Sequence, residues 1–352
     1  MRRFISESNL YQPLKLLYMI YHRFRKGKGF CYTDATGMNV KDPALKAFFA
    51  SLVIPPAWEK VSINSSKRAK IQATGYDIKG RKQYIYNPKF RKQQDDQKFD
   101  RIIRFAAQLE HMRRVTGQHL RKRKLSREKV LATMVRLLEA AFFRPGNEYY
   151  RKANQSYGLT TLRSKHLEIR GNEMIFTYRG KSGQDQEKHV VDARLTKIVQ
   201  ELDELPGYEI FRYIDDEDNI HDIRSNDLNE YIHEVMGEEF SAKDFRTWAG
   251  TVIAAMALDE IGAVEPEDQK NLKKNIRDAV ITVSEKLGNT PAIARSSYID
   301  PRVITHYTQG RTLATVHRAV QKMMQTNEQL SVEELGVLCL LQKRLDTTTP
   351  AV

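Results

Sequence analysis

Three kinds of side chain that suit chemistry on a phosphodiester occur together in four stretches of the chain. Arginine stays charged, and its planar fork holds phosphate oxygens in pairs, so arginines can stabilise the charge that develops there. A lysine can donate a proton, and a tyrosine can attack phosphorus and later leave again. The stretches are Arg144-Pro-Gly-Asn-Glu-Tyr149, with Asn154-Gln-Ser-Tyr-Gly-Leu-Thr-Thr-Leu-Arg163 after it; Tyr178-Arg-Gly-Lys181-Ser-Gly; Ala242-Lys-Asp-Phe-Arg246-Thr-Trp-Ala-Gly-Thr251; and Leu287-Gly-Asn289-Thr-Pro-Ala-Ile-Ala-Arg-Ser-Ser-Tyr298.

Each of these residues also has an ordinary structural explanation. Tyr298 taken alone would be a packing residue, and Lys181 a lysine in a turn. Arg144 could be a cation at a helix C-terminus, and Arg246 could form a surface ion pair with Asp244. Their occurrence together in a basic chain favours the chemical interpretation.

Other familiar sites are missing from the sequence. Gly180-Lys181-Ser182 resembles the end of a phosphate-binding P-loop, but that motif needs a glycine where Ile175 stands. The nine histidines show no metal-ligand spacing, Cys31 and Cys339 are far apart, and there is no Gly-x-Ser-x-Gly motif. The sequence therefore predicts no metal, no nucleotide cofactor and no other cofactor.

The charge of the chain is unevenly distributed. The 352 residues carry a formal net charge of +14, of which +12 lies in residues 1–97. A second basic run, Arg121-Lys122-Arg123-Lys124, lies near Arg113, Arg114, Arg127 and Lys129. Neutralising phosphates and releasing their counterions is the main source of affinity for duplex DNA, so this distribution favours a polyanionic partner.

No membrane association is expected. No apolar run approaches the roughly 20 residues of a spanning helix. The apolar stretch 14–21 contains Lys15 and runs into basic residues rather than a small-residue cleavage site, so it is expected to belong to the folded chain. We expect a cytoplasmic protein, associated with the nucleoid if the source is bacterial.

The elements that must position these residues fall into two predicted domains. A basic domain of 1–92 is expected to be mainly β with a helix or two, and includes a strand at Lys82–Tyr86 that places Tyr84 and Tyr86 on one face. A polar linker is expected at 93–97, because that segment has no apolar residue. A catalytic domain of 98–345 and a loose tail of 346–352 complete the chain.

The larger domain is expected to be mostly helical with a small three-stranded sheet, which gives an α+β fold class. Ser126 is predicted to cap a helix, and helices are expected at 228–236, 245–257, 275–287 and 332–345, the last amphipathic. Thr290 and Pro291 are typical of another helix start. The predicted strands are His166–Arg170, Glu173–Arg179 and Glu187–Val191.

Together the four stretches resemble the type IB DNA topoisomerases, in their small poxvirus and bacterial branch. In the first domain, Ile54-Pro-Pro-Ala-Trp58, Ile71-Gln-Ala-Thr-Gly75 and Lys79-Gly-Arg-Lys-Gln-Tyr84 resemble that branch's DNA-covering N-terminal domain, and the resemblance spans about residues 27–310. It implies an isomerase that relaxes supercoiled double-stranded DNA by transient cleavage and rejoining of one strand. Neither ATP nor an obligatory metal is implied, and the expected form is a monomer that clamps DNA.

The resemblance also implies roles for individual residues. Tyr298 would attack a backbone phosphate to give a 3′-phosphotyrosyl bond. Arg144 and Arg246 would bind the non-bridging oxygens, Lys181 would protonate the departing 5′-oxygen, and Asn289 would donate a hydrogen bond to a phosphate oxygen. The expected DNA-binding residues are Arg81, Lys82, Gln83, Tyr84, Tyr86 and Tyr150.

Two other functions remain open at this point. A tyrosine recombinase uses similar Arg, Lys and Tyr chemistry, but its second arginine belongs to a His-x-x-Arg motif, whereas this chain has Lys243-Asp-Phe-Arg246. An inactive DNA-binding module is the other alternative, and it is disfavoured because all five expected catalytic positions are filled.

Overall fold

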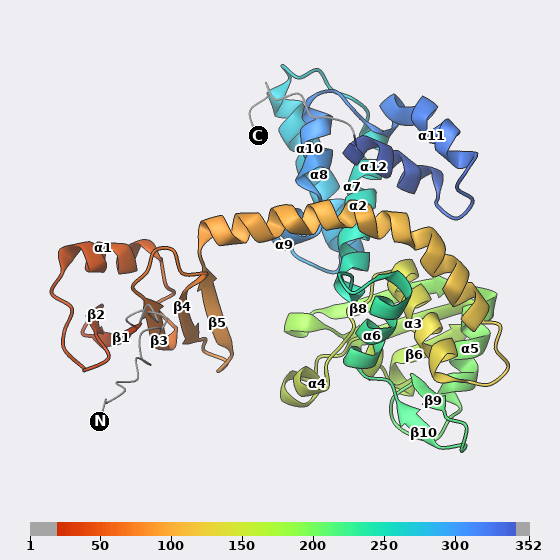
Figure 1. Ribbon diagram of the computed structural model, residues 1–352, viewed down its shortest axis with the longest axis horizontal. Coiled ribbons are helices and arrows are strands. Elements are labelled where there is room, and N and C mark those ends of the chain that lie inside the picture. The colour runs from red at the N-terminus through yellow and green to blue at the C-terminus, as the bar shows by residue number, and fades with distance from the viewer. Residues whose placement is uncertain (1–19, 343–352) are drawn as a thin grey trace, which may run out of the picture. The chain divides into compact units, whose positions relative to one another are not determined.

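In this computed structural model residues 20–342 are described, and the chain divides into two compact units between Gln97 and Lys98 (Figure 1). The N-terminal unit is built on a β-sheet, and the C-terminal unit is mostly helical with small sheets. The predicted α+β fold class is therefore confirmed. The expected tail at 346–352 and most of the apolar stretch 14–21 lie outside the described residues.

A five-stranded antiparallel sheet, in the order β2-β1-β3-β4-β5, forms the N-terminal unit. Its strands are β1 (Ile20–Lys26), β2 (Gly29–Thr33), β3 (Glu59–Asn64), β4 (Ile71–Tyr76) and β5 (Lys82–Tyr86). Helix α1 (Pro43–Ser51) contributes Phe49, whose ring centroid lies 5.2 Å from that of Tyr21. With Val61 and Ile63 these rings form a core on one face of the sheet.

Helix α2 (Pro88–His119) runs through the boundary between the units. The segment 93–97, expected to be a linker, is helical in the structure. Glutamine, which supplies three of these five residues, favours helices, and no glycine or proline interrupts the run, so its polarity reflects solvent exposure on a helix. Beyond the boundary the helix buries Phe99, Ile102 and Phe105 at helical spacing.

Helix α3 (Arg127–Ala141) lies in the core of the C-terminal unit and packs against a small antiparallel sheet of order β6-β7-β8. The Ser126 side chain caps α3 by accepting a hydrogen bond from the Lys129 backbone N–H, as predicted. The strands are β6 (Leu167–Arg170), β7 (Glu173–Arg179) and β8 (Asp185–Val191). All three predicted strands are present, and β8 begins at Asp185 rather than Glu187.

Further helices and one hairpin complete this unit. They are α4 (Glu148–Asn154), α5 (Ala193–Asp203), β9 (Arg212–Ile214), β10 (Ile220–Asp222), α6 (Ser225–Met236), α7 (Ala242–Ile261), α8 (Gln269–Leu287), α9 (Pro291–Ser297), α10 (Pro301–Thr308), α11 (His317–Met324) and α12 (Val332–Gln342). The helices predicted at 228–236, 245–257 and 275–287 fall within α6, α7 and α8. Gly288, with φ +61°, ends α8, and Thr290 caps α9 with Pro291 in its first turn.

Helix α12 differs from its prediction as an amphipathic helix. It packs against α7, α10 and α11, and every residue from Leu335 to Leu341 is buried. A helix covered on several sides has no polar face to present, so its apolar side chains surround it. The predicted residues beyond Gln342 are outside the described part of the chain.

Residues 20–342 contain neither a membrane-spanning helix nor a cluster of metal-ligating side chains. None of the described helices is both long and apolar enough to cross a membrane. The same part of the chain has no group of three His, Cys, Asp or Glu side chains that could hold a metal ion.

Candidate active site

Helix α7 places Arg246 in the interior of the C-terminal unit, where the residue is only 2% exposed. Its guanidinium donates hydrogen bonds to the carbonyl oxygens of Phe142, just after α3, and of Leu287, at the end of α8, the latter at 2.8 Å. Its Nε is buried without a hydrogen-bond partner among the described residues. The alternative of a surface ion pair with Asp244 is wrong, because Asp244 binds Arg101 at 2.8 Å.

Arg144 lies on a short segment after α3 that packs closely against the backbone around Gly158. The Arg144 and Pro145 carbonyl oxygens accept hydrogen bonds from the backbone N–H groups of Leu159 and Thr160 at 2.9 and 2.8 Å. A Cβ on Gly158 would lie 2.7 Å from the Arg144 carbonyl oxygen, a distance shorter than Cβ atoms keep from other heavy atoms in proteins. Gly158 therefore permits the close backbone approach that fixes Arg144.

The C-terminus of α8 brings the two arginines together. Arg144 Nη2 donates to the Gly288 carbonyl oxygen at 2.9 Å and to the Asn289 side-chain oxygen, and Arg246 binds the adjacent Leu287 carbonyl. The last carbonyls of a helix carry partial negative charge, which offsets the repulsion between two guanidinium groups. The Nδ2 of Asn289 is buried and has no partner among the described residues.

Tyr298 follows α9 and lies against α7. A Cβ on Gly250 would stand 2.6 Å from the Tyr298 carbonyl oxygen, so only glycine allows α7 to approach this closely. The Thr251 hydroxyl accepts a hydrogen bond from the Asp300 backbone N–H at 3.1 Å and so fixes the segment that follows. The Arg246 Cζ lies 5.0 Å from the centroid of the Tyr298 ring.

The site affects its two tyrosines in opposite ways. Burial raises the pKa of Tyr178 on β7 to about 12, despite the charges of Arg144 and Arg246. Burial would also raise the pKa of Tyr298, but the charge of Arg246, its hydrogen bond to the phenol and the charge of Arg144 together lower that pKa below the usual value. Tyr298 is therefore the phenol that ionises more readily.

Lys181 lies in the turn between β7 and β8 and is exposed. The turn is a short 3-10 helix, Lys181–Gly183, in which Ser182 has a φ of +64°. The Lys181 ammonium makes no hydrogen bond or ion pair with any described residue, so the structure does not join it to the two arginines. The other four expected catalytic residues do come together. Arg144 binds the Asn289 side chain, and Arg246 lies against the Tyr298 ring; the two arginines bind neighbouring groups at the end of α8.

A second lysine, which the sequence reasoning missed, lies with the arginines. Lys188 on β8 is 8% exposed, and its Nζ donates to the Lys286 carbonyl oxygen at 2.8 Å. Burial and the charges of Arg246 and Arg144 lower the pKa of Lys188 to about 8. The sequence does hold one sign of this burial: side chains alternate along β8, so Lys188 lies on the same face as the apolar Val190.

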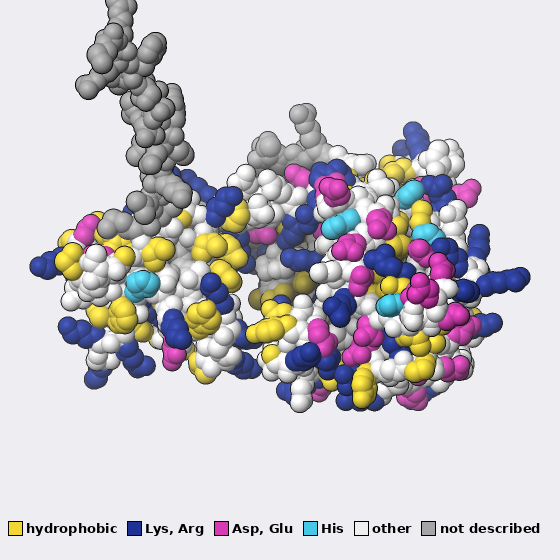
Figure 2. Space-filling view, turned by 60° about the horizontal axis from the view of Figure 1, so that its bottom comes forward, with side chains coloured by type: hydrophobic (Ala, Val, Ile, Leu, Met, Phe, Trp, Pro, Cys, Tyr) yellow, Lys and Arg dark blue, Asp and Glu magenta, His cyan; other side chains and the backbone are white. Residues whose placement is uncertain are grey.

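The expected DNA-binding side chains of the N-terminal unit lie on β5 and the turn before it. Lys82, Tyr84 and Tyr86 are exposed on one face of this edge strand, and the two rings stack at 6.0 Å. Arg81 and Gln83 instead bind the Asp77 carboxylate, at 2.8 and 2.9 Å. Figure 2 shows that Lys and Arg side chains predominate over Asp and Glu on this unit, whereas the two are mixed on the C-terminal unit.

Tyr150 belongs to the C-terminal unit. It lies on the short helix α4, which begins four residues after Arg144, and 52% of its surface is exposed. Its ring packs edge-on against that of Tyr149 at 5.5 Å. Tyr150 is therefore accessible to a ligand but makes no contact with the arginine cluster.

Comparison with known proteins agrees with this geometry. Residues 87–329 match the model of the family described as eukaryotic DNA topoisomerase I, catalytic core, and residues 29–77 match bacterial DNA topoisomerase IB, N-terminal domain. DNA topoisomerase 1B of Acanthamoeba polyphaga mimivirus is 32% identical over 253 residues, which cover 70% of this chain and 75% of the viral one. The vaccinia virus (strain Copenhagen) enzyme of the same name is 26% identical over 235 residues, 65% of this chain and 70% of its own. The chain belongs to the type IB DNA topoisomerases.

Proposed function

We propose that this chain relaxes supercoiled duplex DNA through a covalent bond between Tyr298 and the 3′ end of one cleaved strand. The Tyr298 phenolic oxygen attacks phosphorus, the bond from phosphorus to the 5′-oxygen breaks, and that oxygen takes up a proton. Attack by the freed 5′-hydroxyl then reverses these steps and releases the phenol. Because the phosphotyrosyl bond retains the energy of the phosphodiester, the cycle needs no ATP.

One observation carries this proposal: a tyrosine with a lowered pKa stands over a buried arginine whose Nε is unpaired. A buried donor without a partner is costly, and a phosphate oxygen would satisfy it. The Nδ2 of Asn289 offers a second such donor. We infer that the non-bridging oxygens lie between Arg246, Asn289 and Arg144, where the charge of the transition state develops.

We propose Lys181 as the group that protonates the departing 5′-oxygen. Its exposed place in a turn lets the side chain approach bound DNA, and no intramolecular interaction with a described residue has to be broken first. Lys188 is the competing residue, because it is already close to the arginines. Its bond to the Lys286 carbonyl and its burial favour a positioning role instead.

The acid can be identified with a substrate whose 5′-bridging oxygen is sulfur, a leaving group that needs little protonation. Lys181→Ala should lose most cleavage of ordinary DNA and regain nearly all of it on the sulfur substrate. Lys188→Met, the matched variant, should show no such recovery. Recovery by Lys188→Met alone would transfer the acid role to Lys188.

We further propose that Lys82, Tyr84 and Tyr86 of the N-terminal unit contact the DNA, with Arg81 and Gln83 beside them, and that Tyr150 of the C-terminal unit also contacts it. The positive charge of the N-terminal unit and its exposed aromatic rings support this assignment. We also propose that the chain is a monomer, and that it acts in the DNA-containing compartment of a cell. Sedimentation of the purified chain would test the monomeric state.

The deciding experiment adds denaturant to the chain during reaction with a labelled nicked duplex. Protein should remain on the 3′ end of the cleaved strand, and peptide mapping should place the link at Tyr298. Tyr298→Phe should abolish both the link and plasmid relaxation without ATP or metal. Tyr178→Phe, which removes the neighbouring phenol, should retain both, and relaxation by the Tyr298→Phe variant would refute the assignment.

A further inference from the structure

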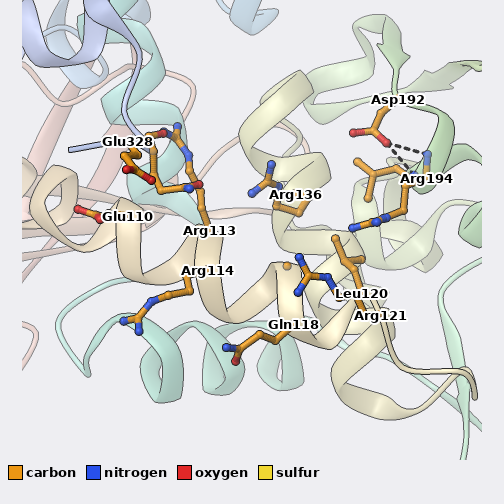
Figure 3. Close-up of a pocket in the computed structure, with 13 residues that line it drawn as sticks. Glu110, Arg113, Arg114, Gln118, Leu120, Arg121, Arg136, Asp192, Arg194 and Glu328 are labelled. Carbon is orange, nitrogen blue, oxygen red and sulfur yellow. Dashed lines mark hydrogen bonds between the residues drawn. The ribbon is translucent and has the colours of Figure 1, made fainter. Parts of the chain in front are cut away.

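A cavity of about 590 Å³ lies in the C-terminal unit, lined by residues of α2, α3 and α5 and of the segment before α12 (Figure 3). This volume is typical of sites for small molecules. Its lining includes five arginines, none of which belongs to the active site described above: Arg113, Arg114, Arg121, Arg136 and Arg194.

Three of these arginines come from different elements and surround the same space. Arg121 follows α2, Arg136 is on α3 and Arg194 is in the first turn of α5; in Figure 3 the side chains of Arg121 and Arg194 both extend toward the middle of the cavity view. Neither of these two guanidinium groups has a hydrogen bond or ion pair with any described residue. Within residues 20–342 Arg136 pairs only with Glu139, at 3.4 Å, and Glu139 also binds Arg113 at 2.6 Å.

The acidic residues of the lining offset the charge of this group only in part. Asp192 caps α5 by accepting hydrogen bonds from the backbone N–H groups of Arg194 and Leu195, both at 2.9 Å. Glu110 accepts one from the Asn327 side chain at 3.2 Å, and in Figure 3 it lies with Glu328 near Arg113, away from Arg194. Beside Arg121, Arg136 and Arg194 lie two carboxylates, Asp192 and Glu139, and Glu139 is shared with Arg113, so this side of the cavity keeps an excess of positive charge.

We propose that Arg121, Arg136 and Arg194 bind a compact polyphosphate anion. A guanidinium fork pairs with two phosphate oxygens at once, and three forks offer more donors than a single phosphate group can use. A concave site on one unit fits a compact anion better than the long, evenly charged backbone of a duplex. Phosphate groups of DNA are the other source of the same chemistry, and the test separates the two.

Binding is tested by calorimetric titration of the full chain with sodium tripolyphosphate at constant ionic strength. The wild type should bind at one saturable site, and Arg121→Gln/Arg194→Gln should bind about tenfold more weakly or worse. Arg123→Gln/Lys197→Gln removes the same charge from nearby exposed positions outside the cavity lining, and it should bind like the wild type. Because the assay needs no DNA cleavage, its result is independent of Tyr298.

Three results of the titration would overturn the proposal. These are the absence of saturable binding by the wild type, equal affinity in Arg121→Gln/Arg194→Gln, and an equal loss in the Arg123→Gln/Lys197→Gln control.

Duplex binding by the cavity variant, Arg121→Gln/Arg194→Gln, distinguishes the two sources of phosphate. Its duplex affinity and salt dependence should match those of the wild type. A lower duplex affinity with a flatter salt dependence would instead assign these arginines to the DNA backbone. Equal melting temperatures of the variants would show that all are folded.

Discussion

Three cationic side chains of the active site share one helix end. Lys188, Arg246 and Arg144 donate to the carbonyl oxygens of residues 286, 287 and 288, which follow one another at the C-terminus of α8. These bonds hold the cations at fixed places without an acidic side chain, which would compete with phosphate for them. The site is therefore preorganised for an anion, and Lys188 takes part although it need not contact DNA.

Removing the Lys188 ammonium should slow cleavage more than it weakens binding. With Lys188→Met, we expect the single-turnover cleavage rate to fall about tenfold, as for the loss of one charge-assisted hydrogen bond, with nearly unchanged DNA affinity. Lys188→Arg should recover part of the rate. Glu187→Gln, on the exposed face of the same strand, should behave as the wild type.

The pH profile distinguishes this role from general damage to the fold. The pKa of Lys188 is lowered to about 8, so its charge is present below that pH and lost above it. Wild-type cleavage should therefore decline above about pH 8 as the end of α8 loses its ammonium, and Lys188→Met should lack this decline. A decline that persists in Lys188→Met would show that another group causes it.

At the scale of elements, α7 determines where the tyrosine stands. Arg246 and Gly250 are one turn apart on α7, so the same face of the helix provides the cation and the gap for Tyr298. Gly250→Ala would force a Cβ within 2.6 Å of the Tyr298 carbonyl oxygen, and the displaced backbone would move the phenol. We expect about a hundredfold loss of cleavage rate, since small misplacements of reacting groups cost that much.

The control for this change is Gly117→Ala on α2, where a Cβ meets no atom within 4 Å. It should leave cleavage unchanged and raise the free energy of unfolding slightly, because alanine favours a helix over glycine. Cleavage and urea denaturation should be measured on both variants. Normal cleavage by Gly250→Ala would mean that Tyr298 reaches its reactive position by another route.

Elements with local signals could be predicted from the sequence, and elements that depend on their neighbours could not. Gly288, Thr290 and Pro291 mark the end of α8 and the start of α9 by themselves, and the turn at Lys181 separates two recognisable strands. The polar segment 93–97 is helical because one exposed helix continues through it, and the burial of α12 on several sides follows from tertiary contacts that no local pattern records. Lys188 was missed for the same reason, since a lysine in an alternating strand is usually exposed.

For the whole molecule, the uneven charge of the chain determines how binding should respond to salt. Each phosphate that a lysine neutralises contributes about one unit to the slope of log affinity against log salt concentration. Lys82 makes no ion pair with a described residue, whereas Arg81 binds Asp77 at 2.7 Å and helps to lower the pKa of that carboxyl to about 2. Their contributions to DNA binding should therefore differ.

Lys82→Gln should lower duplex affinity and flatten this slope by about one unit, whereas Arg81→Gln should flatten it by clearly less. Lys28→Gln is the matched control, because it lies in the turn between β1 and β2, and the strand order places β2 at the sheet edge opposite β5. It should leave the slope nearly unchanged. Affinities measured by fluorescence anisotropy at several salt concentrations give all three slopes. An equal effect of Arg81→Gln and Lys82→Gln would mean that the ion pair to Asp77 opens when DNA binds, which would place the whole turn before β5 on the phosphate backbone.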